Sequence, residues 1–367
     1  MAHMNDYVVN FHPNTYADEG GQECKVDCSL GVNLEELPQK VLDKLETLSP
    51  NHLKNYPHDE KVFDCVLKKL QKLNPKLTNE NIAMGCGSID VLLNLDNLFI
   101  NTEKKVVGIA PQFSAYVDDI NLKGATYVGV ELKKEDNYKV NVDAICKTIL
   151  KEKPDLIYID NPNNPTGQII SPSKLQTIYS AAESVDAAMI VDEAYGDYMD
   201  QNDNSMIGYV GKLKDLIVIK TMSKGYGMAG MRMGYAVASK EIIELLSKLL
   251  VPFNCNSLAR DLAISMLEDD DYLIGLKEIT ENKMRKIKES LNGKIKISET
   301  ADCIPISLLY TDDESVDLAK VLANVGIAAV SGAGFDNLGV NSVRLMVPAE
   351  SDMNLLCELL KKAEETL

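Results

Sequence analysis

Six short apolar runs, rich in β-branched residues, recur along the middle of this 367-residue chain. We predict strands at Lys105–Ala110, Thr126–Val130, Asp155–Asp160, Ala188–Asp192, Leu216–Lys220 and Gly234–Ala238. Helical patterns lie between or after them, at Ser114–Leu122, Val142–Leu150, Ser171–Ser184 and Glu241–Leu249. Alternation of this kind is typical of a mostly parallel sheet with helices on both faces. The chain is therefore predicted to be an α/β protein.

The two ends of the chain have a different pattern. Residues 5–35 are polar and irregular, and they predict an extended arm with one short strand. The last hundred residues predict a long helical section from Asn256 to about Leu291, then alternating strands and helices. We expect residues 5–45 to form an arm and part of a small domain. Residues 46–255 would form the large domain, and residues 256–367 the C-terminal small domain.

Composition limits the possible partners. The formal net charge of −17 argues against nucleic acid, which binds clustered Lys and Arg. No apolar run approaches the length of a membrane span. Eight cysteines are scattered without CxxC spacing, so we expect no metal site and reduced thiols in the cytoplasm.

The stretch from Thr221 to Gly234 follows a predicted strand and contains one lysine, Lys224, among glycines. Ligands bind at the carboxyl ends of strands in open α/β sheets. We infer that Lys224 forms an imine with an aldehyde cofactor, whose phosphate would be bound by Thr221, Ser223 and Arg232. The alternative is an ordinary lysine in a glycine-rich loop.

Two further strand ends carry polar residues. Asp192 could face a pyridine nitrogen and keep it protonated, or it could cap the next helix. Asn164 lies in the rigid heptapeptide Asn161-Pro-Asn-Asn-Pro-Thr-Gly167, where its amide could donate to a phenolate oxygen, although such a sequence could also form a simple turn.

A phosphate site is also expected at the start of a helix after Gly85. There the backbone N–H groups of Ser88 and Ile89 could bind the anion. Phe113 follows another strand and could stack on an aromatic ring or pack in the core.

The chain has only four arginines, against 34 lysines. Arginine supplies a planar bidentate fork that lysine does not. Arg344 lies in a predicted strand and could bind a substrate carboxylate; a surface ion pair is the alternative.

Together these motifs resemble the fold-type I pyridoxal-phosphate enzymes, specifically the class I/II aminotransferases, over nearly the whole chain. The resemblance implies a seven-stranded sheet, pyridoxal 5'-phosphate as cofactor, and transfer of an amino group from an L-amino acid to a 2-oxo acid by a ping-pong mechanism. It implies that Lys224 forms the internal aldimine and moves the proton, and that Asp192 pairs with the pyridine nitrogen. Asn164 and Tyr195 would bond the phenolic oxygen.

The resemblance assigns further roles. Phe113 would stack on the ring, and Tyr56 would reach the phosphate in a neighbouring subunit, which implies a homodimer with shared active sites. Arg344, Gly31 and Asn164 would bind the substrate. Candidates for reading its side chain are Tyr16, Asn33, Asn254 and Asn256.

Within the family the chain is most similar to the branch of histidinol-phosphate aminotransferase and threonine-phosphate decarboxylase. That branch usually has a phosphate-binding arginine where this chain has Val330, so we expect a substrate other than histidinol phosphate. Decarboxylation or β-elimination on the same fold remains an alternative reaction. A regulatory cofactor-binding domain is disfavoured, because fewer than 40 residues precede the first predicted helix.

Overall fold

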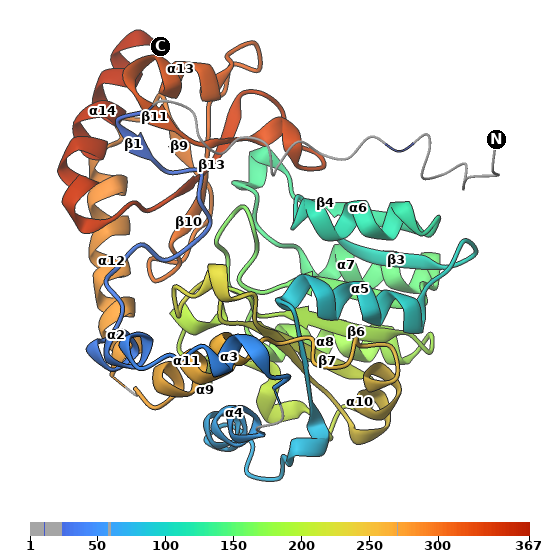
Figure 1. Cartoon of the computed structure of the whole chain (residues 1–367). Coiled ribbons are helices and arrows are strands. Elements are labelled where there is room, and N and C mark those ends of the chain that lie inside the picture. Colours follow the sequence, from blue (N-terminus) through green and yellow to red (C-terminus); the bar gives the residue numbers. More distant parts are fainter. Residues whose placement is uncertain (1–10, 12–23, 58–59, 270) are drawn as a thin grey trace, which may run out of the picture.

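A seven-stranded sheet forms the centre of the computed structural model, which describes residues 11, 24–57, 60–269 and 271–367 (Figure 1). The strand order is β2-β8-β7-β6-β5-β3-β4. Its strands are β2 (Ile82–Gly85), β3 (Lys105–Ala110), β4 (Thr126–Glu131), β5 (Leu156–Asp160), β6 (Ala188–Asp192), β7 (Leu216–Thr221) and β8 (Gly234–Val237). Neighbouring strands from β4 to β7 are parallel, whereas β8 is antiparallel to both β7 and β2. The predicted mostly parallel seven-stranded sheet is confirmed.

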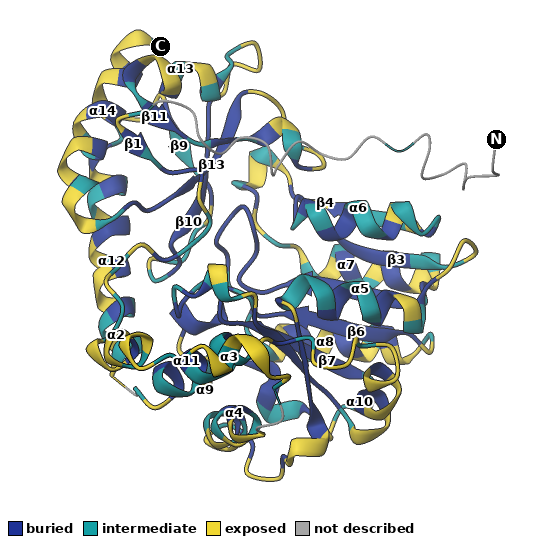
Figure 2. Ribbon diagram, in the orientation of Figure 1, coloured by how far each residue is buried: buried dark blue, intermediate teal, exposed yellow. Residues whose placement is uncertain are grey.

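Helices cover both faces of this sheet. One face packs against α5 (Ser88–Phe99), α6 (Ser114–Leu122) and α10 (Lys240–Ser247). The other packs against α2 (Gln39–Glu46), α4 (Lys61–Gln71), α7 (Val142–Glu152), α8 (Pro172–Glu183) and α11 (Ser257–Leu267). In β6, Met189 and Val191 point to one core while Ala188 and Ile190 point to the other. Because both faces are covered, the central strands are buried along their length, which explains their continuous apolar runs (Figure 2).

A smaller α+β unit lies beside the sheet and uses both ends of the described chain (Figure 1). The short strand β1 (Val26–Asp27) pairs in parallel with β11 (Ile327–Ala328). An antiparallel sheet, in the order β12-β13-β10-β9, contains β9 (Lys296–Ile297), β10 (Ile306–Tyr310), β12 (Val330–Ser331) and β13 (Ser342–Met346). Helices α12 (Tyr272–Ser290), α13 (Leu318–Val325) and α14 (Met353–Thr366) pack with these strands around a separate apolar core.

Short elements complete the described chain. The helices α3 (Asn51–Lys54) and α9 (Gln201–Asn204) have only four residues each. Single 3₁₀ turns are η2 (Asn79–Asn81), η3 (Lys134–Asp136), η4 (Gly196–Tyr198), η5 (Met206–Tyr209), η6 (Ala229–Met231), η7 (Gly332–Gly334) and η8 (Glu350–Asp352). None of the helices among these residues is long and apolar enough to cross a membrane.

The structure refines the expected elements in three places. Residues 82–85 form a strand because β8 offers them an antiparallel partner, a pairing that a four-residue run does not reveal. The helical section after Asn256 is two helices, α11 and α12. The apolar side chains of α11 join the core under the large sheet, so we propose that the small domain begins after this helix rather than at residue 256.

A bridging segment, residues 28–38, connects the two units across the carboxyl ends of the strands of the large sheet. The chain leaves β1 and runs alongside α12 to reach α2, as the blue trace in Figure 1 shows. Glycine 31 lies in the middle of this segment. Residues that follow β3, β5, β6 and β7 line one cavity at this edge of the large sheet, and two of them, Tyr195 and Lys224, lie next to Gly31.

Candidate active site

A cavity of about 170 Å³ lies at the carboxyl ends of the parallel strands. The residues that line it are Ser88, Ile89, Phe113, Asp160, Pro162, Asn164, Asp192, Ala194, Tyr195, Ser223, Lys224, Ala229 and Arg232. Most of the residues that the sequence predicts for cofactor binding therefore surround one space. Of the predicted cofactor-binding residues, Thr221 and Tyr56 do not line it, and neither do the predicted substrate-binding residues Arg344 and Gly31.

Lys224 follows β7 in a tight turn. The turn is possible because Gly227 adopts a φ of 68°, a left-handed conformation that favours glycine. The Nζ atom of Lys224 donates to the carbonyl oxygen of Gly31 at 2.7 Å and lies 5.3 Å from the centre of the Tyr195 ring. The lysine thus extends from the sheet toward the segment that bridges the two units.

Gly31 marks the point where three predicted residues converge. A Cβ atom built on it would lie 2.8 Å from Tyr195 Oη, 3.3 Å from Lys224 Nζ and 3.5 Å from Arg344 Nη1. Arg344 is only 1% exposed, and its guanidinium donates to the Ser29 carbonyl. A lysine, a phenol and an arginine therefore meet within a few ångströms of one backbone position, although they come from distant parts of the chain.

The other end of the cavity is suited to an anion. Gly87, with a φ of 84°, precedes the first residue of α5, so the N–H groups of Ser88 and Ile89 begin a helix. The Arg232 guanidinium lies against Gly87, 2.5 Å from the position that a Cβ would take there. Arg232 also donates to Ser223 Oγ at 3.4 Å. Helix N–H groups and a guanidinium together provide the positive potential that a phosphate requires.

Asp192 forms the floor of the cavity at the end of β6. Its Oδ1 accepts from the Ala194 amide at 3.0 Å, and its Oδ2 accepts from the Tyr158 hydroxyl at 2.9 Å. Burial raises the pKa of Asp192 to about 6, while the Tyr158 hydrogen bond and the charge of Lys224 oppose this rise. The group is therefore a carboxylate at neutral pH and is suited to pair with a protonated ring nitrogen.

Asp160, which was not among the predicted site residues, lines the same cavity. Its Oδ2 accepts from the backbone amides of Phe113 at 3.1 Å and Asn164 at 3.0 Å. Asn163 donates to its other oxygen at 2.8 Å. Burial raises the pKa of Asp160 to about 7. This carboxylate ties two loops together, and its position at a strand end in register with Asp192 was the available signal.

Thr221 and Tyr56 lie outside the cavity. The Thr221 hydroxyl donates to the Met233 carbonyl at 3.2 Å and accepts from the Ser223 amide at 3.2 Å. We propose that Thr221 positions Ser223 rather than touching the phosphate. Tyr56 is 71% exposed and stacks on Phe253, with ring centroids 4.8 Å apart.

The residues suggested for reading the substrate side chain are used elsewhere. The Asn33 amide donates to the Gly225 carbonyl at 2.9 Å and to the Tyr272 hydroxyl at 2.8 Å. Asn254 donates to the Met84 carbonyl, and Asn256 caps α11. These bonds hold the backbone around the site, and they engage both polar atoms of the Asn33 amide, whose Oδ1 also accepts from the Glu35 amide. A role for Asn254 or Asn256 in reading the substrate side chain stays a prediction. Tyr16 lies outside the described residues.

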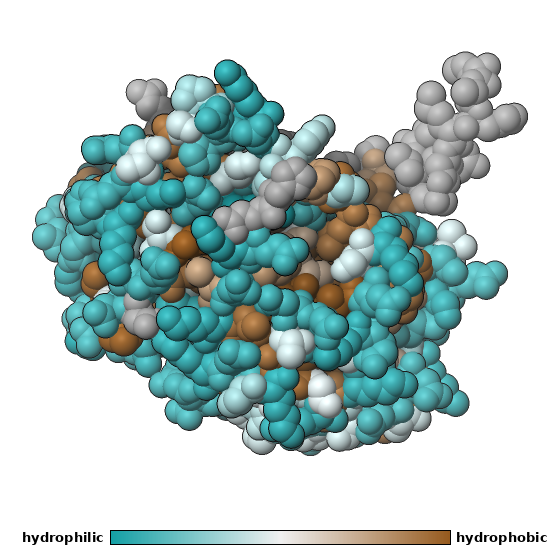
Figure 3. All heavy atoms as spheres, turned by 60° about the horizontal axis from the view of Figure 1, so that its bottom comes forward, coloured by the Kyte–Doolittle hydropathy of each residue, from teal (hydrophilic) through white to brown (hydrophobic). Residues whose placement is uncertain are grey.

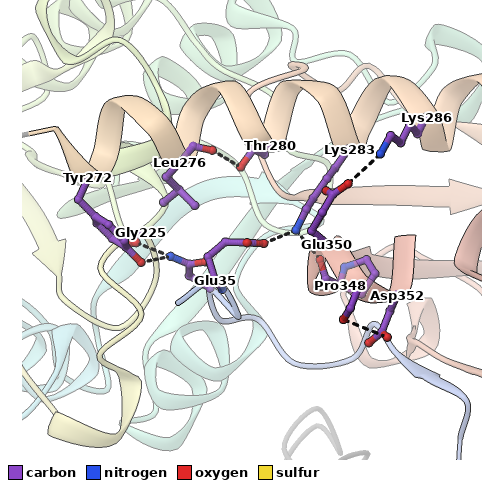
Figure 4. A network of polar contacts seen from close by, with 12 residues as sticks. Glu35, Gly225, Tyr272, Leu276, Thr280, Lys283, Lys286, Pro348, Glu350 and Asp352 are labelled. Carbon is purple, nitrogen blue, oxygen red and sulfur yellow. Dashed lines mark hydrogen bonds and ion pairs between the residues drawn. The ribbon is translucent and has the colours of Figure 1, made fainter. Parts of the chain in front are cut away.

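Figure 4 shows how the bridging segment is attached to α12. Lys283 is almost fully buried in this helix; it contacts the Glu35 carboxylate and donates to the Pro348 carbonyl at 2.8 Å. Asn33 links the same segment to Tyr272 at the start of the helix. Two polar contacts thus fix residues 33–35, and with them the approach to Gly31.

These features match the needs of pyridoxal phosphate. The cavity lining combines an anion site at the start of α5 and Arg232, the buried carboxylate of Asp192, and the amine of Lys224. The Asn164 Oδ1 atom is buried without a hydrogen-bond partner among the residues that the structure describes, so it is available to accept a hydrogen bond from an N–H or O–H group of a ligand. No cluster of three or more metal-binding side chains occurs in the described ranges.

The family model described as aminotransferase class I and II matches residues 9–362. The histidinol-phosphate aminotransferase of Caldicellulosiruptor saccharolyticus is 31% identical over 331 residues, which cover 90% of this chain and 88% of that protein. The Chlorobaculum tepidum enzyme of the same name is 29% identical and covers 96% of this chain and 98% of its own length.

Solved structures share the fold. The Sinorhizobium meliloti histidinol-phosphate aminotransferase, in complex with pyridoxal-5'-phosphate, has a TM-score of 0.84 at 17% identity, with 100% of this chain and 98% of that chain covered. Aspartate aminotransferase from Thermus thermophilus with maleate also has a TM-score of 0.84, at 18% identity, with 99% of this chain and 100% of that chain covered. At these identities the likeness concerns the fold.

Proposed function

The chain belongs to the aminotransferase class I and II family and is a pyridoxal-phosphate-dependent aminotransferase; from this premise we propose that it acts on L-amino acids whose α-carboxylate binds Arg344. The observation that supports this most directly is the convergence of Lys224, Tyr195 and Arg344 around Gly31. A substrate anchored at the arginine would bring its amino group to the lysine.

We assign the cofactor-binding roles from the positions described above. Ser88, Ile89, Ser223 and Arg232 would hold the phosphate, and Asp192 would face the ring nitrogen. When bound, pyridoxal phosphate supplies an aldehyde for the amino group and a ring that withdraws electrons from the reacting carbon. Lys224 would hold the cofactor and then carry the proton between the substrate carbon and the cofactor, at its Nζ atom.

We propose that Arg344 binds a carboxylate rather than a phosphate because of the residue that pairs with it in the small sheet. Val330, in β12, pairs with Arg344, in β13, and is 2% exposed. An apolar side chain therefore occupies the position where the resemblance expects a second cation. One guanidinium matches the single charge of a carboxylate, whereas a phosphate dianion would be left with less charge-assisted hydrogen bonding.

Histidinol phosphate is a second candidate substrate, because the relatives from Caldicellulosiruptor saccharolyticus and Chlorobaculum tepidum are named histidinol-phosphate aminotransferases. A half-reaction screen distinguishes the two. The purified protein, loaded with cofactor, is mixed with each amino acid and with histidinol phosphate while its visible absorbance is followed. We expect a change with a carboxylate donor; a change with histidinol phosphate alone would refute our proposal. Lys224→Ala should abolish both the response and the covalent attachment of the cofactor.

We also propose a homodimer in which Tyr56 reaches the partner's phosphate site. Leu53, Tyr56, Val251 and Phe253 are large apolar side chains that are 75%, 71%, 66% and 45% exposed. Figure 3 shows one face of the molecule, on which several hydrophobic residues, in brown, lie toward the middle among hydrophilic ones. Exposed apolar patches commonly mark protein contacts. Light scattering should give twice the chain mass, and Tyr56→Phe should weaken cofactor binding.

The cellular location is proposed from the thiols. No disulfide joins any of the eight cysteines, all of which lie in the described ranges, and Cys28 and Cys255 are buried. Reduced thiols in this number fit a reducing compartment, and we propose the cytoplasm.

A further inference from the structure

Behind the floor of the active site lies a buried phenol that the expected chemistry does not use. Tyr158 belongs to β5, the strand beside β6, and is 0% exposed. Its hydroxyl donates to Asp192 Oδ2 at 2.9 Å. Among the residues that the structure describes, the other donor to this carboxylate is the Ala194 amide, which donates to Oδ1. Each oxygen of Asp192 is thus held by one donor from the protein.

The surroundings of Asp192 make this hydrogen bond important. Burial is the largest effect on the pKa of Asp192 and raises it; the nearby Glu193 carboxylate raises it further, and the Tyr158 bond and Lys224 lower it. Asp160, at the same level on β5, is a third buried carboxyl, and the charge of Asp192 helps to raise its pKa. Removing the phenol would leave a buried carboxylate with one neutral donor fewer and a stronger affinity for a proton.

We propose that Tyr158 is a positioning residue for amino transfer, which holds the Asp192 carboxylate in one orientation and keeps it a weaker base than the ring nitrogen that it faces. This inference rests on the proposed function. If Asp192 became the stronger base, the shared proton would move from the ring to the carboxylate. The ring would then withdraw electrons less effectively, and the ion pair that anchors the cofactor would be lost.

The chain offers a matched control in Tyr116 of α6. This residue is also 0% exposed, and its ring centroid lies 4.2 Å from that of Tyr158. Its hydroxyl, however, donates to Asp96 at 2.5 Å and not to Asp192. Tyr116→Phe therefore removes a phenol of the same type and burial from the same core, without removing a bond to the site carboxylate.

The test compares wild type, Tyr158→Phe and Tyr116→Phe loaded with pyridoxal phosphate labelled with ¹⁵N in the ring. The ¹⁵N chemical shift reports ring protonation as a function of pH, and equilibrium dialysis measures cofactor affinity. A hydrogen bond to a charged group corresponds to about a 10- to 100-fold effect. We expect Tyr158→Phe to lower the pH midpoint by about one to two units and to weaken cofactor binding about 10-fold or more.

Tyr116→Phe should leave the pH midpoint within a few tenths of a unit of wild type. An unchanged midpoint and affinity in folded Tyr158→Phe would overturn the inference, as would equal shifts in both variants. If Tyr158→Phe does not fold, 3,5-difluorotyrosine at position 158 provides a stronger donor and should raise the midpoint; a lower or unchanged midpoint would also overturn it. Failure of the proposed function is distinct, because the half-reaction screen would then show no response to carboxylate donors, while the cofactor affinities and ¹⁵N midpoints of the three proteins could still be compared.

Discussion

Replacing Gly31 with alanine tests the geometry on which the substrate assignment rests. The new Cβ would lie 2.8 Å from Tyr195 Oη, closer than the 3.0 Å that real Cβ atoms keep, and 3.3 Å from Lys224 Nζ. Either the bridging segment or these side chains must move. Inserting a methyl group into a packed site costs about 1–3 kcal/mol. If the full cost appears in the transition state, kcat/KM falls about 5- to 150-fold.

The measurement is steady-state kinetics with the amino donor found in the half-reaction screen, together with thermal melting. We expect a loss in kcat/KM and little change in melting temperature, because Gly31 is only partly buried. Gly334→Ala is the matched control. A Cβ there would meet no atom within 4 Å among the described residues, so its kinetics should equal those of wild type. Gly31→Ala with kcat/KM within twofold of wild type would refute the proposed convergence.

Three further substitutions follow from the structure. Gly275→Ala in α12 adds a methyl group where no described atom lies within 4 Å, and it should stabilise the protein by about 0.5–1 kcal/mol; a lower melting temperature would contradict this. Gly234→Ala would place a Cβ 2.3 Å from the Ser88 amide nitrogen, so dialysis should show weaker cofactor binding, and unchanged affinity would count against the phosphate site. Burial raises the pKa of the Asp96 carboxyl from 3.8 to about 8. The protonated carboxyl therefore makes its whole contribution to the free energy of unfolding below about pH 4, and this contribution is lost as the pH rises through 8. Asp96→Asn should flatten that dependence in melting experiments, and identical pH profiles would refute the assignment.

The sheet could be predicted from sequence because its signal is local. The bounds of β3, β6 and α6 agree with the predicted Lys105–Ala110, Ala188–Asp192 and Ser114–Leu122. Buried parallel strands require continuous apolar runs, and the helices that cover them require an apolar stripe. Strands that depend on a distant partner are different. Residues 82–85 pair with residues 234–237, and their sequence alone does not reveal this pairing.

The residues of the candidate site also fall into those that the sequence reveals and those that it does not. Lys224, Asp192 and Asn164 could be found because each follows an apolar strand, and a parallel sheet brings such ends together. Asp160 also follows a strand, but its role as the acceptor for two loop amides depends on how the loops fold back. A carboxylate that accepts hydrogen bonds from backbone amides has no sequence signature beyond its position at the end of a strand.

The segment that closes the site was the least predictable part, because every contact that fixes it joins residues far apart in the chain. Asn33 bonds to Tyr272 across 239 positions, and Arg344 bonds to Ser29 across 315. Asn33 therefore resembled a substrate ligand in the sequence, since a polar residue near a glycine carries no mark of its partner. Its amide is already engaged by Gly225 and Tyr272, so it can act on the reaction only by holding the backbone between Gly31 and the lysine loop. The residues that perform the chemistry are thus recognisable from their type and local context, whereas those that align them are defined by contacts that exist only after folding.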